Sequence, residues 1–323
     1  MQQSALADDE VVTAPVIDNE FGRALRAGLR AMPKQISPKF FYDERGSQLF
    51  DQICELPEYY PTRTEFSILE HNAAAIAEQI GPRAEIIEFG AGSLTKVRVL
   101  LDALDAPQRF LPIDISGDHL ESAADELRLD FPDLDVEAIA GDYTRSLELP
   151  DRAANAGRRV GFFPGSTIGN FTPEEALAFL KRAARLLHGG GLLIGVDLVK
   201  SPTILHAAYN DAQGVTAAFN MNLLRRANRE LGTDFDLDGF EHYAFYNPTL
   251  RRIEMHLVSR RDQSVQLGEE RFEFREGETM HTESSHKFTN HGLARLAAEA
   301  GFGAGKCWTD PERLFSVHWL PIN

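Results

Sequence analysis

Cysteine is scarce in this sequence, and long apolar segments are missing from it. Cys54 and Cys307 are the only two cysteines among 323 residues. Two thiols so far apart build no disulfide framework, which is typical of a protein from a reducing compartment. No apolar run approaches the roughly 20 residues of a membrane-spanning helix, and no basic segment followed by an apolar one opens the chain. We therefore expect a cytoplasmic protein with no signal peptide and no membrane partner.

An excess of basic residues is also absent. The formal net charge is −16, and no dense cluster of lysines and arginines stands out, which argues against a nucleic-acid partner or an anionic membrane surface. None of the ten histidines lies in a His-Glu-x-x-His or similar spacing, so we expect no metal. Apolar residues make up 43% and charged residues 25% of the chain, as in an ordinary globular protein. The sequence does not fix the oligomeric state, and a monomer stays open.

A strand, a glycine turn and a helix start follow one another from residue 85. Glu85–Phe89 is a short apolar run with β-branched residues, as expected of a buried parallel strand. Gly90 and Gly92 then turn the chain, and Ser93 is placed to cap a helix. Glycines let a ligand approach bare backbone, and a helix start offers unpaired N–H groups. The stretch therefore predicts the first crossover of a nucleotide-binding fold.

An acid at the end of the next strand strengthens this interpretation. The second strand is expected at Arg109–Asp114, and Asp114 follows Gly90 at about the distance that lets a carboxylate bind ribose hydroxyls. The alternative is a tight turn followed by a helix-capping aspartate. The turn lacks the third glycine of dinucleotide sites, and it follows an acid, Glu88. A two-glycine turn beside an acid suits a positively charged ligand without phosphate, such as S-adenosylmethionine (SAM), and indicates a methyltransferase.

Strands and helices alternate through the middle of the chain. Five buried strands are expected, at 85–89, 109–114, 135–140, 159–163 and 191–197. Helices between them, one of which starts at Pro173, predict an α/β fold with a doubly wound, Rossmann-like parallel sheet. Between about residues 200 and 283 the rhythm breaks, and Arg252–Leu257 and Arg271–Arg275 alternate as antiparallel strands do. From Asn290 the α/β rhythm returns with a helix and a closing pair of strands.

The chain divides into three parts on this basis. Residues 1–16 are polar and acidic and are expected to be disordered. Residues 17–64 and an insertion at 200–283 are expected to form a mixed α+β substrate-binding lobe. Residues 65–199 and 284–323 are expected to form the SAM-binding methyltransferase core.

Three helices are predicted ahead of the first strand of the sheet, and Leu49, Phe50, Ile53 and Leu56 mark the middle one. Phe21, Leu25 and Leu29 mark one apolar helical face. Thr62 and Glu65 have the spacing of a capping box, which predicts the start of a helix that runs to residue 80.

Several short motifs carry a resemblance that reaches beyond the glycine turn. They are Phe41–Asp43, Leu56–Glu65, Gly165–Asn170, Gly214–Asn220, Ile253–Met255 and Thr282–Phe288. In these motifs, and over nearly all of the chain after the first twenty residues, the sequence resembles the ergothioneine-pathway histidine N-alpha-methyltransferase family. The resemblance implies an enzyme that uses SAM as cosubstrate. Its small-molecule substrate would be L-histidine, converted through the mono- and dimethyl forms to the trimethylated betaine, hercynine.

The resemblance also implies roles for individual residues. The residues assigned to SAM are Gly90, Lys96, Asp114, Asp142 and Tyr143. Those assigned to the substrate α-carboxylate are Asn170 and Tyr209. Those assigned to the imidazole ring are Met255, Glu283 and Ser285. The residues around the reacting amine are Tyr42 and Tyr59, both counted as catalytic.

Tyrosine suits the amine position because the product is a quaternary ammonium ion, which an aromatic face stabilises by about 0.5–2 kcal/mol. Without the resemblance, Tyr42 and Tyr59 could equally fill contacts between lobes, and Met255 would be a core residue. Two other functions stay open. One is the same reaction on another amino acid, such as an aromatic one, and the other is a SAM-binding module without turnover.

Overall fold

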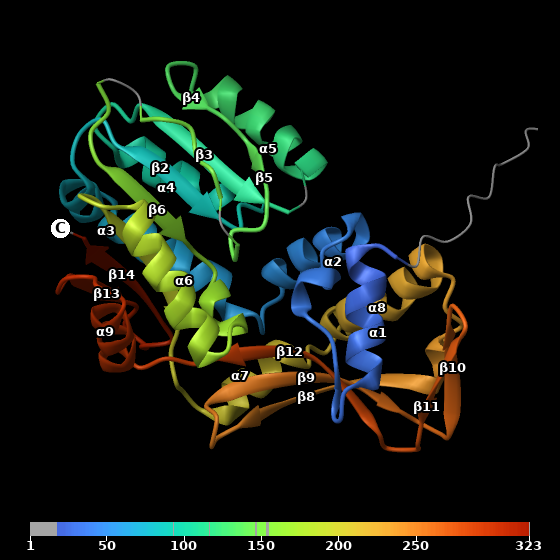
Figure 1. Ribbon diagram of the computed structural model, residues 1–323. Coiled ribbons are helices and arrows are strands. Elements are labelled where there is room, and N and C mark those ends of the chain that lie inside the picture. The colour runs from blue at the N-terminus through green and yellow to red at the C-terminus, as the bar shows by residue number, and fades with distance from the viewer. Residues whose placement is uncertain (1–17, 93, 116, 146, 153–154, 323) are drawn as a thin grey trace, which may run out of the picture.

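The computed structural model describes residues 18–322 except 93, 116, 146 and 153–154. The disorder predicted for residues 1–16 lies outside the described residues. Two sheets organise the chain, a large one surrounded by helices and a smaller one (Figure 1). Within the described part of the chain, no helix is long and apolar enough to cross a membrane.

The large sheet has eight strands. Its members in spatial order are β13 (Lys306–Thr309), β14 (Phe315–Pro321), β7 (Gly191–Asp197), β6 (Arg159–Phe163), β2 (Glu85–Phe89), β3 (Arg109–Asp114) and β4 (Asp135–Val136), with β5 (Ile139–Ala140) also paired to β3. The strands from β7 to β5 are parallel, whereas β14 and β13 close the edge in antiparallel fashion. The single strand predicted over 135–140 is two short ones, because only residues 135–136 and 139–140 pair with β3.

Helices cover both faces of this sheet because its buried strands alternate between two cores. Ile86 belongs to one core and the next residue, Ile87, to the other. The first core packs against α3 (Tyr60–Ile80), α4 (Thr95–Ala103) and α5 (Gly117–Asp130). The second packs against α6 (Pro173–Leu186) and α9 (Asn290–Glu299). This arrangement confirms the predicted doubly wound α/β fold.

The strand order reverses between β2 and β6. From β2 the chain proceeds to β3 on one side, and from β6 it proceeds to β7 on the other. Ligands of open α/β sheets bind at such a switch point, outside the carboxyl ends of the strands. The glycine turn after β2 and the loop Pro164–Asn170 after β6 both lie at this point.

The smaller sheet has four strands. Its members in spatial order are β1 (Lys34–Gln35), β12 (Thr279–His286), β9 (Arg252–Ser259) and β8 (Phe240–Asn247). A separate hairpin consists of β10 (Gln263–Leu267) and β11 (Glu270–Phe274). The antiparallel pairing of β9 and β11 with their neighbours confirms the strands predicted there.

One apolar core joins these strands to helices from both ends of the sequence. The helices are α1 (Glu20–Arg30), α2 (Glu44–Glu55), α7 (Pro202–Tyr209) and α8 (Val215–Leu231), with 3-10 turns η1 (Pro38–Phe41) and η3 (Leu237–Gly239). Phe21, Leu25 and Leu29 of α1 are buried in this core, which confirms the helical face predicted for them. Residues 18–60 therefore pack with residues 202–286, far away in the sequence.

One predicted helix start differs from the structure. The capping box at Thr62 and Glu65 is wrong, because α3 already begins at Tyr60 and Pro61 occupies its first turn. Glu65 is buried inside the helix. The cap predicted at Ser93 lies outside the described residues, and Leu94, in a left-handed conformation with φ of 54°, precedes α4.

Candidate functional site

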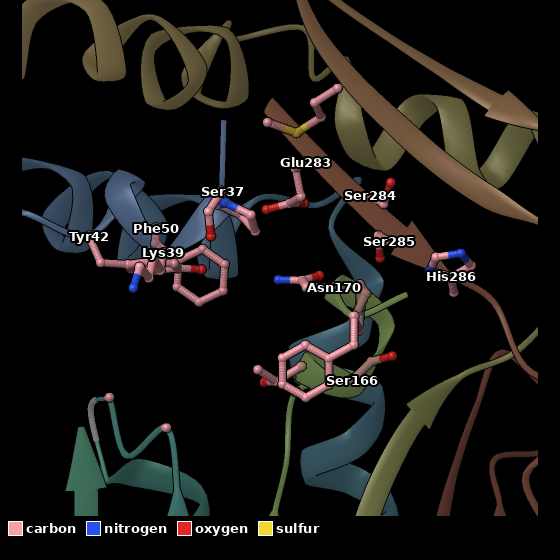
Figure 2. Close-up of a pocket in the computed structure, with 18 of the residues that line it drawn as sticks. Ser37, Lys39, Tyr42, Phe50, Ser166, Asn170, Glu283, Ser284, Ser285 and His286 are labelled. Carbon is pink, nitrogen blue, oxygen red and sulfur yellow. The ribbon is translucent and has the colours of Figure 1, made fainter. Parts of the chain in front are cut away.

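A cavity of about 1270 Å³ lies where the two sheets approach each other (Figure 2). Its volume exceeds the roughly 300–1,000 Å³ typical of a site for one small molecule. All twelve residues assigned from the sequence line it: Tyr42, Tyr59, Gly90, Lys96, Asp114, Asp142, Tyr143, Asn170, Tyr209, Met255, Glu283 and Ser285. The chain thus brings together residues from nine separate segments, with room for two ligands at once.

The glycine turn is fixed to the neighbouring strand. The N–H groups of Gly90 and Ala91 both donate to the carbonyl oxygen of Ile113, at 2.9 and 3.0 Å. Gly90 has φ of +72°, and a Cβ there would lie 3.4 Å from Cε1 of Tyr143. Glycine is therefore needed for the backbone conformation, and its missing side chain leaves room for the Tyr143 ring. The turn and Asp114, which follows Ile113, are held in one unit.

A buried acid precedes this turn. Glu88 is 3% exposed, and its Oε2 has no hydrogen-bond partner among the described residues. Burial raises the pKa of Glu88 to about 8, against the opposing effect of nearby Lys96. A carboxyl in this state favours a cationic ligand, because a positive charge beside it lowers the cost of ionising it.

Sequence reasoning missed the residue that links the two loops of the switch point. Glu65, 1% exposed, forms an ion pair with Lys96 and accepts the backbone N–H of Gly165 at 2.9 Å. It therefore ties α4, which follows the first glycine turn, to the loop after β6. Nothing in the sequence showed that Glu65 makes this link. Its spacing from Thr62 indicated only a capping box, and no local sequence pattern marks an acid that is buried inside a helix.

Two further acids border the same part of the cavity. Asp114 ends β3, and Asp142 follows β5. Although burial raises the pKa of Asp142, hydrogen bonds from Thr144 and the charges of Lys39 and Arg145 hold it below its usual value. Asp142 is therefore ionised. Its Oδ2 lies 3.7 Å from Nζ of Lys39, a residue of the N-terminal segment.

A β-bulge orients the acid of the smaller sheet. The pairing of β12 with β9 shifts between His281 and Glu283, which places Glu283 opposite Met255. At the bulge, the Thr282 hydroxyl donates to Asn220 Oδ1 at 2.8 Å and to the Met255 carbonyl oxygen at 3.0 Å. Because a bulge changes which side chains share a face, Glu283 and Ser285 join the side of Met255. Sequence alternation alone did not show this shift.

Glu283 is buried, with 8% of the residue exposed. Burial raises its pKa to about 7, and the positive charge of Lys287 opposes this rise. The Glu283 side chain and the Asn170 amide point into the same space (Figure 2). Near neutral pH this acid can therefore act as a hydrogen-bond acceptor or, when protonated, as a donor.

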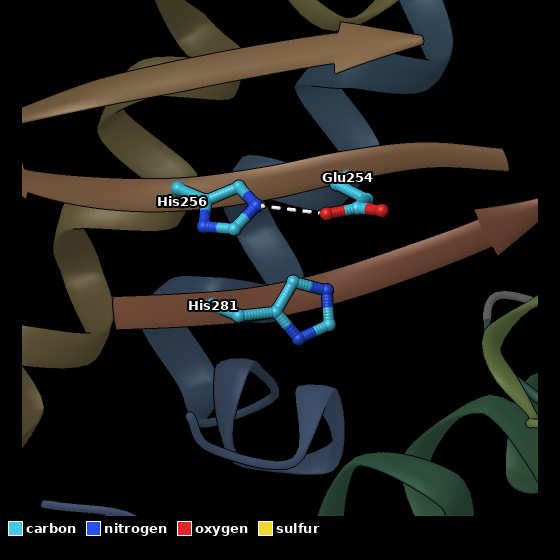
Figure 3. A group of neighbouring side chains, drawn as sticks. All are labelled: Glu254, His256 and His281. Atoms are coloured by element: carbon cyan, nitrogen blue, oxygen red, sulfur yellow. Dashed lines mark hydrogen bonds and ion pairs between the residues drawn. The ribbon is translucent and has the colours of Figure 1, made fainter. Parts of the chain in front are cut away.

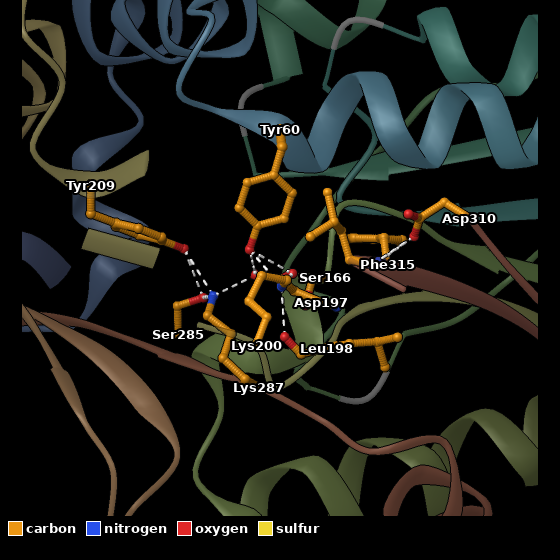
Figure 4. Close-up of polar contacts among 11 residues, drawn as sticks. Tyr60, Ser166, Asp197, Leu198, Lys200, Tyr209, Ser285, Lys287, Asp310 and Phe315 are labelled. Carbon is orange, nitrogen blue, oxygen red and sulfur yellow. Dashed lines mark hydrogen bonds and ion pairs between the residues drawn. The ribbon is translucent and has the colours of Figure 1, made fainter. Parts of the chain in front are cut away.

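A buried charge network lies behind Ser285 (Figure 4). The Tyr209 hydroxyl donates to Ser285 Oγ at 2.8 Å, and Lys287 Nζ lies 2.7 Å from the same oxygen. Lys287 also forms an ion pair with Asp197, which accepts the Tyr60 hydroxyl at 2.8 Å. Tyr209 and Ser285, expected to meet different parts of the substrate, are thus direct neighbours. Lys287 and Asp197 were not singled out from the sequence.

The two tyrosines assigned to the reacting amine lie in an aromatic cluster at the cavity wall. Tyr42 packs edge-on against Phe50 and Phe219, and Tyr59 packs edge-on against Phe50 and Tyr209. Burial raises the pKa of Tyr42 and of Tyr59 far above the usual value. Their hydroxyls therefore stay neutral, so neither tyrosine supplies a phenolate base.

Asn170 ends η2 (Thr167–Asn170), the turn that follows β6. This turn packs on β12 closely enough that a Cβ on Gly169 would lie 2.8 Å from the His286 carbonyl oxygen. The His286 ring Nδ1 in turn lies 2.9 Å from the carbonyl oxygen of Gly169. The glycine at 169 thus lets the turn dock on β12, which places Asn170 beside Glu283.

Comparisons with known proteins agree with this fold. The family model of the SAM-dependent, histidine-specific methyltransferases matches residues 21–322. A histidine N-alpha-methyltransferase of Mycolicibacterium smegmatis is 46% identical over 301 residues, with 91% of this chain and 92% of that protein covered. The enzyme of the same name from Mycobacterium tuberculosis is 42% identical, with 89% and 90% covered. The Ergothioneine biosynthesis protein 1 of Neurospora crassa is 31% identical, with 86% of this chain but 32% of that protein covered.

The doubly wound sheet with a cavity at its switch point places the chain among the SAM-dependent methyltransferases. Within that class, the chain belongs to the histidine-specific methyltransferase family.

Proposed function

We propose that this chain transfers three methyl groups from SAM to the α-amino group of L-histidine and so makes hercynine, the first step of ergothioneine biosynthesis. The observation that carries the proposal is the single cavity lined by all twelve assigned residues, at the carboxyl edge of β2 and β6. The family of the chain and its 46% identity to a histidine N-alpha-methyltransferase support the same reaction. The cavity volume of about 1270 Å³ suits a cosubstrate and an amino acid bound together.

SAM would occupy the end of the cavity beside β2. Asp114 would accept hydrogen bonds from the ribose hydroxyls, as an acid at the end of the second strand does in related folds. Gly90 allows close approach to the backbone, and Asp142 and Tyr143 border the same end. The buried acid Glu88 suits the net positive charge of this cosubstrate.

Histidine would occupy the end formed by residues 18–64 and 200–283 together with the rest of β12. The Asn170 amide and the Tyr209 hydroxyl would donate to its α-carboxylate. The positive charge of Lys287, 3.3 Å from the Tyr209 hydroxyl, favours an anion there. Glu283 would accept the imidazole N–H, with Ser285 beside it and Met255 against the ring.

Methyl transfer is an in-line displacement at carbon. The lone pair of the amine nitrogen forms the new N–C bond as the C–S bond breaks, and the positively charged sulfonium becomes a neutral thioether in S-adenosylhomocysteine. The protein holds the amine nitrogen, the methyl carbon and the sulfur in line, and this alignment accounts for much of the rate acceleration. The cationic amine must lose a proton before each transfer. A neutral hydroxyl of Tyr42 or Tyr59 can pass that proton to water, and their ring faces stabilise the quaternary product.

The test is an incubation of the purified protein with SAM and, separately, each of the common amino acids. We expect S-adenosylhomocysteine and a trimethylated product with L-histidine, measured by mass spectrometry. If S-adenosylhomocysteine forms with another aromatic amino acid but not with histidine, that amino acid is the substrate instead. SAM binding in calorimetry without turnover of any amino acid would contradict catalysis altogether.

A further inference from the structure

A cluster of two histidines and one glutamate lies on the face of the smaller sheet opposite to Met255 (Figure 3). His281 of β12 pairs directly with His256 of β9. Glu254 lies two residues before His256 on the same strand, and therefore on the same face. The bulge at Thr282 leaves these residues on one side of the sheet and directs Glu283 to the other. Three polar side chains thus meet on one face of the sheet, and the side chains assigned to the imidazole ring lie on the opposite face.

The three side chains are close enough to share one ion. Each offers one ligand atom, and these atoms lie within 4.8 Å of one another. His256 Nε2 is 3.2 Å from Glu254 Oε2, and the two imidazole centroids are 5.1 Å apart. Metal bonds of about 2.0–2.2 Å in tetrahedral geometry place ligand atoms about 3.4 Å apart. The ligand atoms, within 4.8 Å of one another, must therefore approach by about 1.4 Å at most to reach that distance.

The surrounding contacts hold the ligands in place. Ser284 Oγ lies 3.1 Å from His281 Nε2, a contact that an ion bound at this nitrogen would replace. Arg252 Nε and Asn247 Nδ2 both donate to Glu254 Oε1, at 2.9 and 3.0 Å. The other carboxylate oxygen faces His256. Outer contacts of this kind orient the first ligands of metal sites. Among the described residues, Nδ1 of His256 is buried without a hydrogen-bond partner, so no existing bond of that atom opposes rotation of the ring.

The ionisation states at neutral pH match those that metal binding requires. Burial lowers the pKa of His281 to about 4 and also lowers the pKa of His256, so both rings are neutral. Although burial raises the pKa of Glu254, hydrogen bonds from Arg252 and His256 hold it below its usual value, so this acid is ionised. Neutral imidazole and carboxylate are the forms that coordinate Zn²⁺.

We propose that Glu254, His256 and His281 form a binding site for one divalent transition-metal ion of the Zn²⁺ type. The two imidazole nitrogens and Oε2 of Glu254 supply three ligands, and solvent supplies the fourth. Glu254 and His281 also line the central cavity, which gives the ion a path from solvent. The ion takes the place of the Nε2 proton of His256, which moves to Nδ1 of the same ring, so the imidazole stays neutral and uptake releases no proton. The histidine spacing in the sequence gave no sign of this site, because its ligands come from two strands that pair across the sheet.

The experiment is a titration of the untagged, chelator-treated protein with Zn²⁺ alone. We expect one equivalent to bind in isothermal calorimetry, and one equivalent of Co²⁺ to give the visible absorption of a four-coordinate ion. His256→Gln and His281→Gln should each weaken Zn²⁺ binding at least tenfold. His71→Gln is the matched control, because His71 is exposed on α3, outside this cluster, and should bind Zn²⁺ as the wild type does.

Circular dichroism and SAM affinity verify that each variant is folded. Wild-type protein that takes up no Zn²⁺ at 100 µM overturns the site. So does equal binding by the wild type and both folded cluster variants. If one cluster variant does not fold, the other decides, because each removes a ligand independently. The result does not depend on methyltransferase activity, so the site and the proposed function can fail separately.

Discussion

Lys287 and Asp197 form an ion pair in which Nζ lies 2.8 Å from Oδ2 and each side chain is only 1% exposed. The pair joins the end of β7 in the large sheet to the residue that follows β12 in the smaller one. Although burial opposes it, the charge of Asp197 raises the pKa of Lys287 above its ordinary value. The pair therefore keeps a permanent positive charge beside Ser285 and Tyr209, at the end of the cavity where we propose the substrate carboxylate to bind.

Lys287→Met should destabilise the protein and weaken histidine binding. Because Lys200 also pairs with Asp197, the loss of Lys287 should cost about 1.5–3 kcal/mol, the contribution of a hydrogen bond to a charged group. This is less than the roughly 3–5 kcal/mol of a buried charge left without any partner. We expect a loss of this order in urea unfolding and a rise in KM for histidine of at least tenfold, with a smaller change in SAM affinity. Lys181→Met is the control, because Lys181 is exposed on α6. If the two variants unfold at the same urea concentration, the pair contributes nothing to stability.

Asp114→Ala should weaken SAM binding. A hydrogen bond to a charged group contributes about 1.5–3 kcal/mol, so calorimetry should show at least a tenfold loss of affinity. Asp102→Ala provides the comparison, because Asp102 is exposed on α4 and does not line the cavity. Unchanged affinity in Asp114→Ala would remove the ribose-binding role of this acid.

The large sheet could be predicted well because short stretches of sequence indicate each of its strands and turns. Buried parallel strands are apolar along their whole length, and Gly90 and Pro173 mark the turn and helix start that separate them. All twelve residues assigned from the resemblance line one cavity. For Gly90, Asp114 and Asn170 the reason is general, since motifs at the carboxyl ends of parallel strands converge there.

Contacts between distant segments could not be predicted in the same way. Glu65 and Lys287 are charged residues, which are exposed in most proteins, and their burial depends on partners at Gly165 and Asp197. At the bulge, the Thr282 hydroxyl donates to Asn220 Oδ1 of α8, a partner far away in the sequence. No local period in β12 indicates that its alternation changes there.

Asn170→Ala should affect the two ligands differently. The Asn170 amide is proposed to bind the substrate α-carboxylate, so its loss should raise KM for histidine while the Kd for SAM barely changes. Histamine, which lacks the carboxylate, should be a very poor substrate of the wild type. Efficient methylation of histamine would show that the carboxylate is not recognised.

Glu283→Gln should change how stability depends on pH. Burial raises the pKa of Glu283 from 4.5 to about 7, so between these values the folded protein holds a proton that the unfolded chain has released. The contribution of Glu283 to the unfolding free energy is therefore fully present below pH 4.5 and is lost as the pH rises through about 7. The glutamine variant does not titrate, and should lose less unfolding free energy than the wild type between pH 5 and pH 8. Other acids, including Glu88, titrate in both proteins and cancel in the difference.

Urea unfolding at pH 5 and pH 8 measures this effect. Glu241→Gln is the matched control, because Glu241 is exposed on β8. The unfolding free energy of this variant should change with pH as that of the wild type does. Parallel curves for all three proteins would show that Glu283 is not the buried acid we describe.

Glu283→Ala tests why histidine is chosen. A buried carboxylate that accepts the imidazole N–H is left desolvated and unpaired when phenylalanine or leucine binds, and such sites discriminate strongly. The alanine variant lacks this carboxylate, so it should lose at least tenfold in kcat/KM for histidine, as expected for a charged hydrogen bond worth about 1.5–3 kcal/mol. Its preference for histidine over phenylalanine should narrow at the same time, because the apolar ring no longer meets an unpaired acid. Steady-state rates with both amino acids, in wild type and variant, give the two ratios. A variant that keeps the wild-type ratio would show that Glu283 does not recognise the ring, and selectivity would then have to come from the shape of the cavity around Met255.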